Sequence, residues 1–400
     1  MTHKFIILSL VILGFSMLNC TEQIELKTED FQDALVVEAT FTNEFKKHEI
    51  KLSRTFRLES SDVIVEENAD VKILDSKNNE YVFQDTGNGV YVSNLEFQAL
   101  KDVTYQLIIN TTDGTQYVST EELLPSEASI DNLYPELVNL GDDYGVQIFV
   151  DTNNNLGDAQ FFRYEYDETY KLIAPYYTGM DSKLINVIEG FDGTIHYDVS
   201  IFPNPEMQEI CYPTNYSGII LANKDVVTGD QIVSFPIRFT SHNNYSVFKN
   251  RYSILVRQYV QSANAYNFYR ILKELQGDDS VLLDNQPGFI QGNISSTTNE
   301  NKKVIGYFDV STVDSKRIFF NYKDIGIDIP PYIIDCDAQT FDKSETDDDD
   351  NQSLQLYNYL SSQYTVYDHP DDSTIYTVAK RNCMDCSVFG TSIKPEFWED

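Results

Sequence analysis

Basic residues are scarce in this sequence. Its 400 residues include 29 Lys and Arg against 63 Asp and Glu, which gives a formal net charge of −34. A surface that binds nucleic acid needs clustered Lys and Arg to contact phosphates and release counterions. This deficit excludes nucleic acid as a partner. A basic partner, a basic substrate and calcium stay open, because an acidic surface attracts cations of many kinds.

Motifs of common catalytic chemistries are also missing. The sequence contains no Gly-x-Ser-x-Gly nucleophile turn, no His-Glu-x-x-His zinc helix and no phosphate-binding loop. Glycoside hydrolysis needs only two carboxylates, but nothing marks a pair among the 63 acidic residues. We therefore expect a protein that is not an enzyme and has no cofactor. A glycan- or peptide-acting enzyme is the third hypothesis.

Long apolar runs are absent after the first 20 residues, and the single early run covers residues 5–18. It is shorter than the roughly 20 residues that a membrane-spanning helix requires, and one Lys precedes it, as in a signal peptide. We expect cleavage of residues 1–19, lipid attachment to the Cys20 thiol, and a linker over 20–29. An ordinary secretory signal is the alternative, because a small residue usually stands where Asn19 does.

Cysteine is rare, with five in the chain. If Cys20 carries lipid, four remain, which fits two disulfides in an oxidising compartment. Three pairings are possible, and the sequence does not select one. A zinc site lacks a second Cys-x-x-C or a His pair, and a redox site lacks its βαβ context. The four disulfide candidates are Cys211, Cys336, Cys383 and Cys386.

What the sequence does contain is strand-like alternation. Short runs with a period of two, separated by Gly and Asn turns, begin at Ala34 and predict an immunoglobulin-like β-sandwich over 30–125. Similar runs resume after Pro125 and predict a second β-rich domain over 126–400, with a second immunoglobulin/fibronectin-like sandwich, long loops and a Cys-rich C-terminal motif. Ser262 can cap one helix after that sandwich, at 263–275. The predicted fold is mainly β.

One polar segment resembles a calcium loop. It places oxygen-bearing side chains at positions 1, 3, 5 and 8, but an EF-hand also needs Gly at position 6 and Glu at position 12, which this chain lacks. A polar hairpin loop is the alternative. The weak calcium candidates are Asp151, Asn153, Asn155 and Asp158.

Aromatic residues give a second weak site. The chain has 27 Tyr and 24 Phe, and Tyr offers a large contact area for little loss of side-chain entropy. Two Pro-Tyr clusters are candidate contact loops for sugar or protein recognition, although half-buried Tyr side chains are also ordinary in β-sandwiches. The residues concerned are Tyr176, Tyr177 and Tyr332. Near the chain end, we interpret Trp398 as a structural plug.

Several motifs in a fixed order resemble one family. They include the early cysteine, Leu35-Val36-Val37-Glu38, Gly292-Asn293-Ile294, and a C-terminal group from Cys383 to Trp398. The chain resembles the Bacteroidota lipoproteins grouped as domain-of-unknown-function family 4249, over nearly its whole length. The resemblance implies an outer-membrane lipoprotein encoded beside a TonB-dependent transporter, with that β-barrel as partner and no assigned activity.

We therefore expect a non-enzymatic outer-membrane lipoprotein that helps a TonB-dependent transporter capture or gate its substrate. A structural or assembly subunit of an outer-membrane complex is the alternative. Acidic residues shortly after Cys20 favour the cell-surface face.

Overall fold

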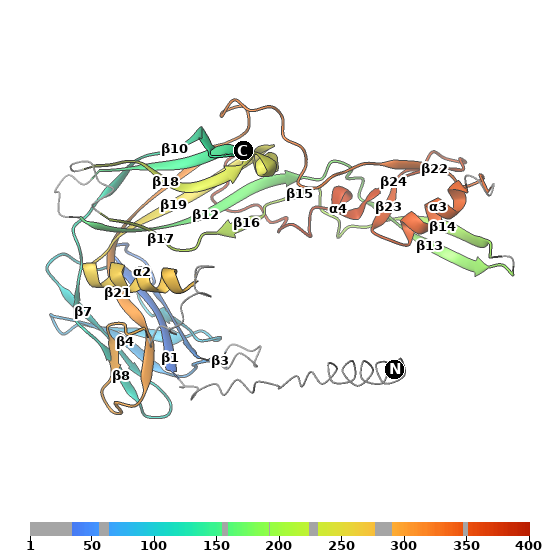
Figure 1. The fold of residues 1–400 in the computed structure, drawn as a ribbon. Coiled ribbons are helices and arrows are strands. Elements are labelled where there is room, and N and C mark those ends of the chain that lie inside the picture. The colour runs from blue at the N-terminus through green and yellow to red at the C-terminus, as the bar shows by residue number, and fades with distance from the viewer. Residues whose placement is uncertain are drawn as a thin grey trace, which may run out of the picture.

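The computed structural model describes residues 34–55, 64–153, 159–191, 193–223, 231–276, 290–346 and 351–400. The predicted signal peptide at 1–19, the lipid site at Cys20 and the linker at 20–29 lie outside these ranges. Within them the protein is mainly β, as predicted, and forms three lobes (Figure 1).

The first lobe is built on nine short strands that alternate buried and exposed positions. In β7, Tyr105, Leu107 and Ile109 are fully buried, and their neighbours are only half-buried. This alternation places one face of each strand on a shared apolar core. The strands are β1 (Ala34–Thr42), β2 (Glu49–Arg54), β3 (Ile64–Val65), β4 (Asp70–Asp75), β5 (Glu80–Asp85), β6 (Val90–Ser93), β7 (Thr104–Asn110), β8 (Gln116–Ser119) and β9 (Glu122–Leu123).

Two later strands complete this lobe. β20 (Ile294–Ser296) pairs with β8, and the first half of β21 (Lys303–Phe320) runs parallel to β1. The predicted division at residue 125 was therefore wrong in assigning the whole of 126–400 to the second domain. Asn293 joins the two ends of the sheet, because its side-chain amide donates to the Phe308 carbonyl at 3.0 Å and its oxygen accepts from the Phe308 N–H at 2.8 Å.

The second lobe is a β-sandwich of two sheets. One sheet has the order β10-β11-β18, and the other contains β12, β19 and the second half of β21. Side chains from both sheets form a single core. The elements are β10 (Ser129–Leu140), β11 (Asp143–Asn153), β12 (Phe161–Ile173), β15 (Ile210–Cys211), β16 (Thr214–Tyr216), β17 (Ile220–Asn223), β18 (Gln231–Ser241), η2 (His242–Phe248) and β19 (Arg251–Val260).

The predicted helix is present as α2 (Ala263–Gln276). Ser262 begins it as expected, since its hydroxyl oxygen accepts from the Ala265 N–H at 3.2 Å. The helix lies between the first and second lobes (Figure 1).

A third lobe extends from the second (Figure 1). It was not predicted, because its pieces come from separate stretches of sequence that share one small core. They are β13 (Met180–Glu189), β14 (Ile195–Pro203), β22 (Gln339–Asp342), α3 (Gln352–Leu360), β23 (Tyr364–Asp368) and β24 (Ile375–Lys380). The short helix α4 (Arg381–Met384) contacts β23 and β24 beside this core.

Both predicted disulfides form, and the structure selects one of the three pairings. Cys211 bonds to Cys386, and Cys336 bonds to Cys383. The first ties β15 to the C-terminal segment, and the second ties the entry of the third lobe to α4. These bonds fix the chain where the second and third lobes meet.

Trp398 is buried, with 5% of its surface exposed, and its ring centroid lies 5.0 Å from that of Tyr212 and 5.7 Å from that of Phe319. We expect Trp398→Ala to lower the free energy of unfolding by about 3 kcal/mol, because it leaves a cavity between these rings. Denaturant unfolding measures this loss. The control is Ile393→Ala, at a side chain that is 77% exposed, and equal stability of the two variants would refute the plug.

Candidate functional site

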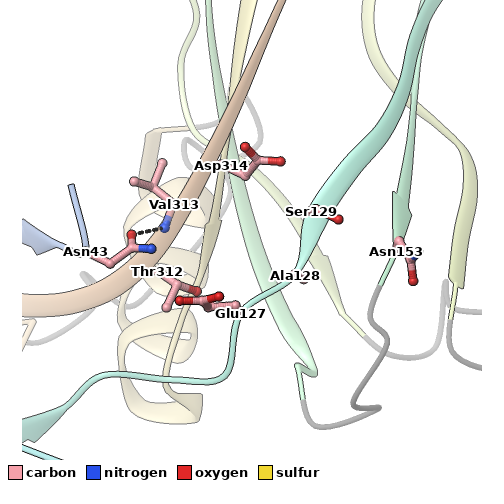
Figure 2. A pocket seen from close by; sticks show the side chains of 8 residues that line it. All are labelled: Asn43, Glu127, Ala128, Ser129, Asn153, Thr312, Val313 and Asp314. Atoms are coloured by element: carbon pink, nitrogen blue, oxygen red, sulfur yellow. Dashed lines mark hydrogen bonds between the residues drawn. The ribbon is translucent and has the colours of Figure 1, made fainter. Parts of the chain in front are cut away.

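The first and second lobes meet along β21. At the meeting point Asn43 accepts a hydrogen bond from the Val313 N–H at 2.8 Å, and Asp314 accepts one from the Ile130 N–H at 2.7 Å. Figure 2 shows Asn43 and Asp314 beside a small hollow of about 390 Å³ that Glu127 also lines. These contacts hold the joint on one side.

A larger cavity, of about 710 Å³, lies at the same joint. Its walls come from β1 and β2 of the first lobe, β12 and β19 of the second lobe, α2, and β21. Small-molecule sites commonly occupy such cavities between domains. The aromatic lining residues are Tyr259, Phe268, Tyr269 and Tyr307.

Arg163 lines this cavity and is 4% exposed. It follows Phe162 and precedes Tyr164 on β12, and those two side chains pack into the sandwich core. Successive strand residues face opposite sides, so Arg163 points to the face that α2 covers. Its guanidinium carbon lies 4.1 Å from the ring centroid of Tyr259 and 4.7 Å from that of Tyr269, which are favourable cation–π distances.

Two carboxylates balance this buried cation. Glu165 accepts a short hydrogen bond from Arg163 Nη1, and Asp309 Oδ2 lies 3.6 Å from Nη2. Gln261 donates to Asp309 at 2.6 Å, and the Ser311 hydroxyl donates at 2.7 Å. The charged groups therefore come from β12 and β21 and link the second lobe to the joint.

The pKa values of these groups are displaced. Burial lowers the pKa of Arg163, but the charges of Tyr269, Glu165 and Asp309 outweigh burial and raise it above its ordinary value. Burial raises the pKa of Asp309, and Arg163 only partly offsets that effect. Burial also raises the pKa of Tyr269 to about 12. Displaced pKa values in a cavity indicate a candidate functional site.

The arrangement suits binding better than reaction. Among the described residues, Arg163 Nε and Nη2 are buried and have no hydrogen-bond partner, so the guanidinium is held by its charge and by ring contacts more than by hydrogen bonds. The remaining lining charges are Glu38, Glu49 and Lys51. Since acids predominate, the cavity favours a neutral or cationic ligand that can stack on the aromatic rings.

Asp309 gives a test by pH. Its pKa in the folded protein lies above the ordinary value of 3.8. The stability that this group contributes is thus fully present below pH 3.8 and is lost as the pH rises through the folded-state pKa. Asp309→Asn cannot ionise, so we expect it to gain at least about 1 kcal/mol relative to the wild type between pH 3.5 and 7. Denaturant unfolding at both pH values measures the difference. The free energy of unfolding of Asp309→Asn minus that of the wild type should rise with pH. If this difference stays constant or falls, the pKa of Asp309 is not raised by folding.

The calcium candidates are only partly described. The Asp151 carboxylate accepts from the Ser234 N–H at 2.8 Å and from the Tyr134 hydroxyl at 3.3 Å, and Asn153 lines the smaller hollow. Asn155 and Asp158 lie outside the described residues. Where the chain is described, no three metal-ligating side chains come together. Calcium binding stays a prediction.

The contact-loop candidates converge on one hollow. Tyr176 and Tyr332 both line a cavity of about 440 Å³ beside Cys336, although they are far apart in sequence. Tyr177 is 38% exposed, but Tyr332 is only 8% exposed, and its hydroxyl donates to the Asn382 carbonyl at 3.3 Å. The prediction that Tyr332 is a contact-loop residue was wrong, because its ring belongs to the core at the disulfides.

None of the predicted site residues that the structure describes lines the larger cavity, and sequence reasoning missed Arg163, Asp309 and Gln261. A signal was available for two of them. Arg163 interrupts the run Phe161-Phe162-Arg163-Tyr164, and Asp309 interrupts the run from Val304 to Val310. A charged residue inside an apolar strand needs a buried partner.

Helices in the described ranges are too short or too polar to cross a membrane. The family model for a domain of unknown function, DUF4249, matches residues 21–317. The chain belongs to this family. The DUF4249 match spans both walls of the larger cavity and the β13–β14 hairpin, and it ends within β21. The disulfide-bonded C-terminal segment thus follows the matched region.

Other comparisons add little to the DUF4249 assignment. A search of curated proteins finds no match. Among solved structures, a DUF4785 family protein from Legionella pneumophila is 11% identical, with 56% of this chain and 51% of that chain covered and a TM-score of 0.17. So low a TM-score carries no argument about fold or function.

Proposed function

We propose that this protein is a lipid-anchored, non-enzymatic protein of the outer membrane that assists a TonB-dependent transporter of Bacteroidota by capturing or gating its substrate. The cavity of about 710 Å³ between the first and second lobes carries the proposal. It combines a sizeable volume between two lobes, aromatic walls and a cation buried in one wall, which are features of a binding site.

The position of the cavity supports a gating role. A ligand there would touch β1 of the first lobe, β12 of the second lobe and α2 together. Because a ligand shifts a conformational equilibrium by its difference in affinity for two states, contacts to both lobes couple binding to their relative orientation. A transporter that contacts either lobe would then sense the ligand.

Filling the cavity tests this role. Leu272 lines the cavity on α2, so Leu272→Trp should occupy part of its volume. The matched control is Glu274→Trp, on the same helix, where the side chain is 61% exposed. We expect a thermal-shift screen of amino acids, short peptides and oligosaccharides to give ligands that stabilise the wild type and the control but not Leu272→Trp. A screen in which all three proteins respond alike would contradict binding in the cavity.

The anchor has its own test. Cys20 is the proposed lipid site, on a chain that enters the first lobe at β1. We expect the wild type to incorporate labelled palmitate and to sediment with outer membranes facing the cell surface, whereas Cys20→Ser should do neither. Equal labelling of both proteins would refute lipidation at this residue.

A structural or assembly subunit of an outer-membrane complex is a second candidate. The exposed apolar tip of the β13–β14 hairpin favours it, since Phe191 is fully exposed there. That candidate predicts protein partners but no ligand in the thermal-shift screen.

A further inference from the structure

The β13–β14 hairpin carries apolar side chains at its tip. Val187 is 47% exposed, Ile188 is 64% exposed and Phe191 is 116% exposed. The hairpin extends from the far end of the third lobe (Figure 1). Exposed apolar residues that gather on one projecting element, rather than singly, indicate an interaction site.

The shape of the tip explains this exposure. The pairing of β13 with β14 shifts register between Ile185 and Ile188, and Asn186 between them has a φ of 52°. Such a bulge re-aims the side chains that follow it. Val187 and Ile188 consequently lie exposed one after the other, whereas a regular strand would turn one of them back towards the lobe.

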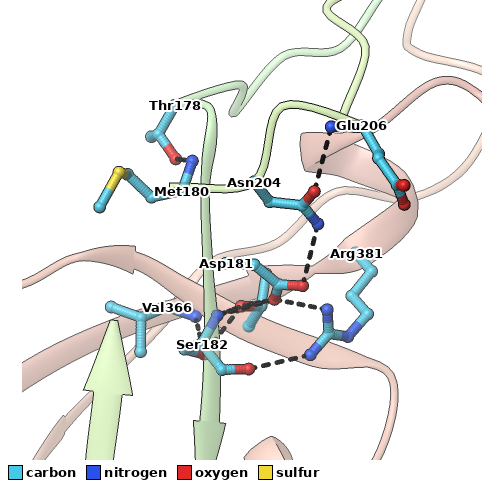
Figure 3. A network of polar contacts seen from close by, with 9 residues as sticks. Thr178, Met180, Asp181, Ser182, Asn204, Glu206, Val366 and Arg381 are labelled. Atoms are coloured by element: carbon cyan, nitrogen blue, oxygen red, sulfur yellow. Dashed lines mark hydrogen bonds and ion pairs between the residues drawn. The ribbon is translucent and has the colours of Figure 1, made fainter. Parts of the chain in front are cut away.

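The base of the hairpin is held firmly. Asp181 on β13 accepts from Arg381 at 2.5 Å, and the Ser182 N–H donates to the Thr365 hydroxyl at 2.9 Å. Figure 3 shows Asp181 and Ser182 between Arg381 and Val366, whose N–H donates to the Ser182 hydroxyl at 3.0 Å. A pinned base presents the tip in one orientation and lowers the entropy cost of docking.

The lobe around the tip is acidic. Among the described residues of 178–206 and 336–385, 11 Asp and Glu stand against four Lys and Arg. Three of the four basic groups have polar partners within the protein: Lys343 lies 3.7 Å from Asp198, Lys380 donates to the Asp335 carbonyl at 2.9 Å, and Arg381 pairs with Asp181. The fourth, Lys183, is exposed and lies 5.5 Å from the ring centroid of Phe202. The excess of carboxylates makes the field around the tip negative.

We propose that this hairpin docks onto a protein whose surface has an apolar pocket for Phe191 ringed by Lys and Arg. Charge complementarity selects this occupant, because it steers association and rejects partners of like charge. A second copy of the chain would bring another acidic lobe, and an anionic membrane would repel this one. The Phe191 ring serves as the buried anchor, a role that aromatic residues often have at interfaces. The inference does not rest on the transport role or on the cavity.

Site-specific cross-linking in intact cells tests the docking. A p-benzoylphenylalanine at position 191 of the full-length anchored protein should give one dominant protein adduct, with the attachment mapped to a peptide flanked by Lys or Arg. We expect Phe191→Ser and Ile188→Ser to reduce recovery of that protein at least tenfold from solubilised membranes. Val82→Ser, at a side chain 42% exposed on β5, should leave recovery unchanged. Raising the salt from 50 to 500 mM should also weaken the complex at least tenfold.

Three outcomes would overturn the proposal. In the first, neither Phe191→Ser nor high salt reduces the amount of the partner protein that is recovered from solubilised membranes. The second is a Phe191-dependent homodimer in light scattering of the purified protein. The third is Phe191-dependent sedimentation with vesicles of phosphatidylcholine, which would make the tip a membrane contact. Circular dichroism of each variant excludes misfolding as the cause of lost binding. None of these outcomes alters the ligand screen on Leu272→Trp, so the two proposals fail separately.

Discussion

Removal of the Cys211–Cys386 disulfide by a double substitution to Ala should lower the free energy of unfolding by about 5 kcal/mol. The two cysteines are 175 residues apart, and a cross-link stabilises chiefly by restricting the unfolded chain, more so for a longer loop. Denaturant unfolding under oxidising conditions measures the change.

The second disulfide is the matched control. Cys336 and Cys383 are 47 residues apart, so their removal should cost less, about 4 kcal/mol. The Cys211–Cys386 bond also lies next to a backbone pairing, because Tyr212 pairs with Thr391 just beyond Cys386. A loss below about 1 kcal/mol for the first pair, or a larger loss for the second, would contradict the assigned pairing and its role.

Arg163→Met should cost about 4 kcal/mol, because it leaves the Asp309 carboxylate buried without its cation. Met keeps much of the apolar volume between Tyr259 and Tyr269, so the loss reports on charge more than on packing. Denaturant unfolding at pH 7 measures this loss in the free energy of unfolding. We also expect the backbone amides of β21 in both the first and the second lobe to lose protection from hydrogen exchange together.

Two further variants isolate the cause. Arg270→Met removes an exposed Arg from α2, where it pairs with Glu274, and should change stability by less than about 0.5 kcal/mol. Asp309→Asn in the Arg163→Met background should restore part of the lost stability, since the buried charge is gone. If Arg163→Met behaves like Arg270→Met, the buried cluster does not hold the joint.

Local features of the fold could be predicted from the sequence. The alternation of Tyr105, Leu107 and Ile109 is a local property of one strand, and β7 follows from it. The α2 helix follows from Ser262 at its start. An even number of remaining cysteines predicted two disulfides, and both form. Each of these signals depends on neighbouring residues alone.

Pairings between distant residues could not be predicted. β1 and β21 pair in parallel although the chain between them includes most of the second lobe, and no period in either strand specifies that partner. The third lobe combines β13 and β14 with β22–β24. In the sequence, β19 and β21 of the second lobe lie between these two groups of strands. The buried cluster of Arg163 and Asp309 depends on this same long-range pairing, so it escaped the search for local motifs.

The predicted contact loops illustrate a further limit. Tyr176 and Tyr332 do approach one another, but Tyr332 is buried beside the disulfides. A Pro-Tyr cluster has the same composition whether its ring faces solvent or fills a core. Phe191 shows the reverse case, because an isolated Phe near two glycines gave no sign of its exposure at a projecting tip.

The claim that this protein assists a TonB-dependent transporter is tested most directly by its partners. The full-length protein, tagged at its C-terminus, should be purified from detergent-solubilised outer membranes and its partners quantified by mass spectrometry. We expect a TonB-dependent β-barrel to copurify in nearly equimolar amount and to be absent from a control that expresses the tag alone. Purification of the protein without any β-barrel partner would contradict it.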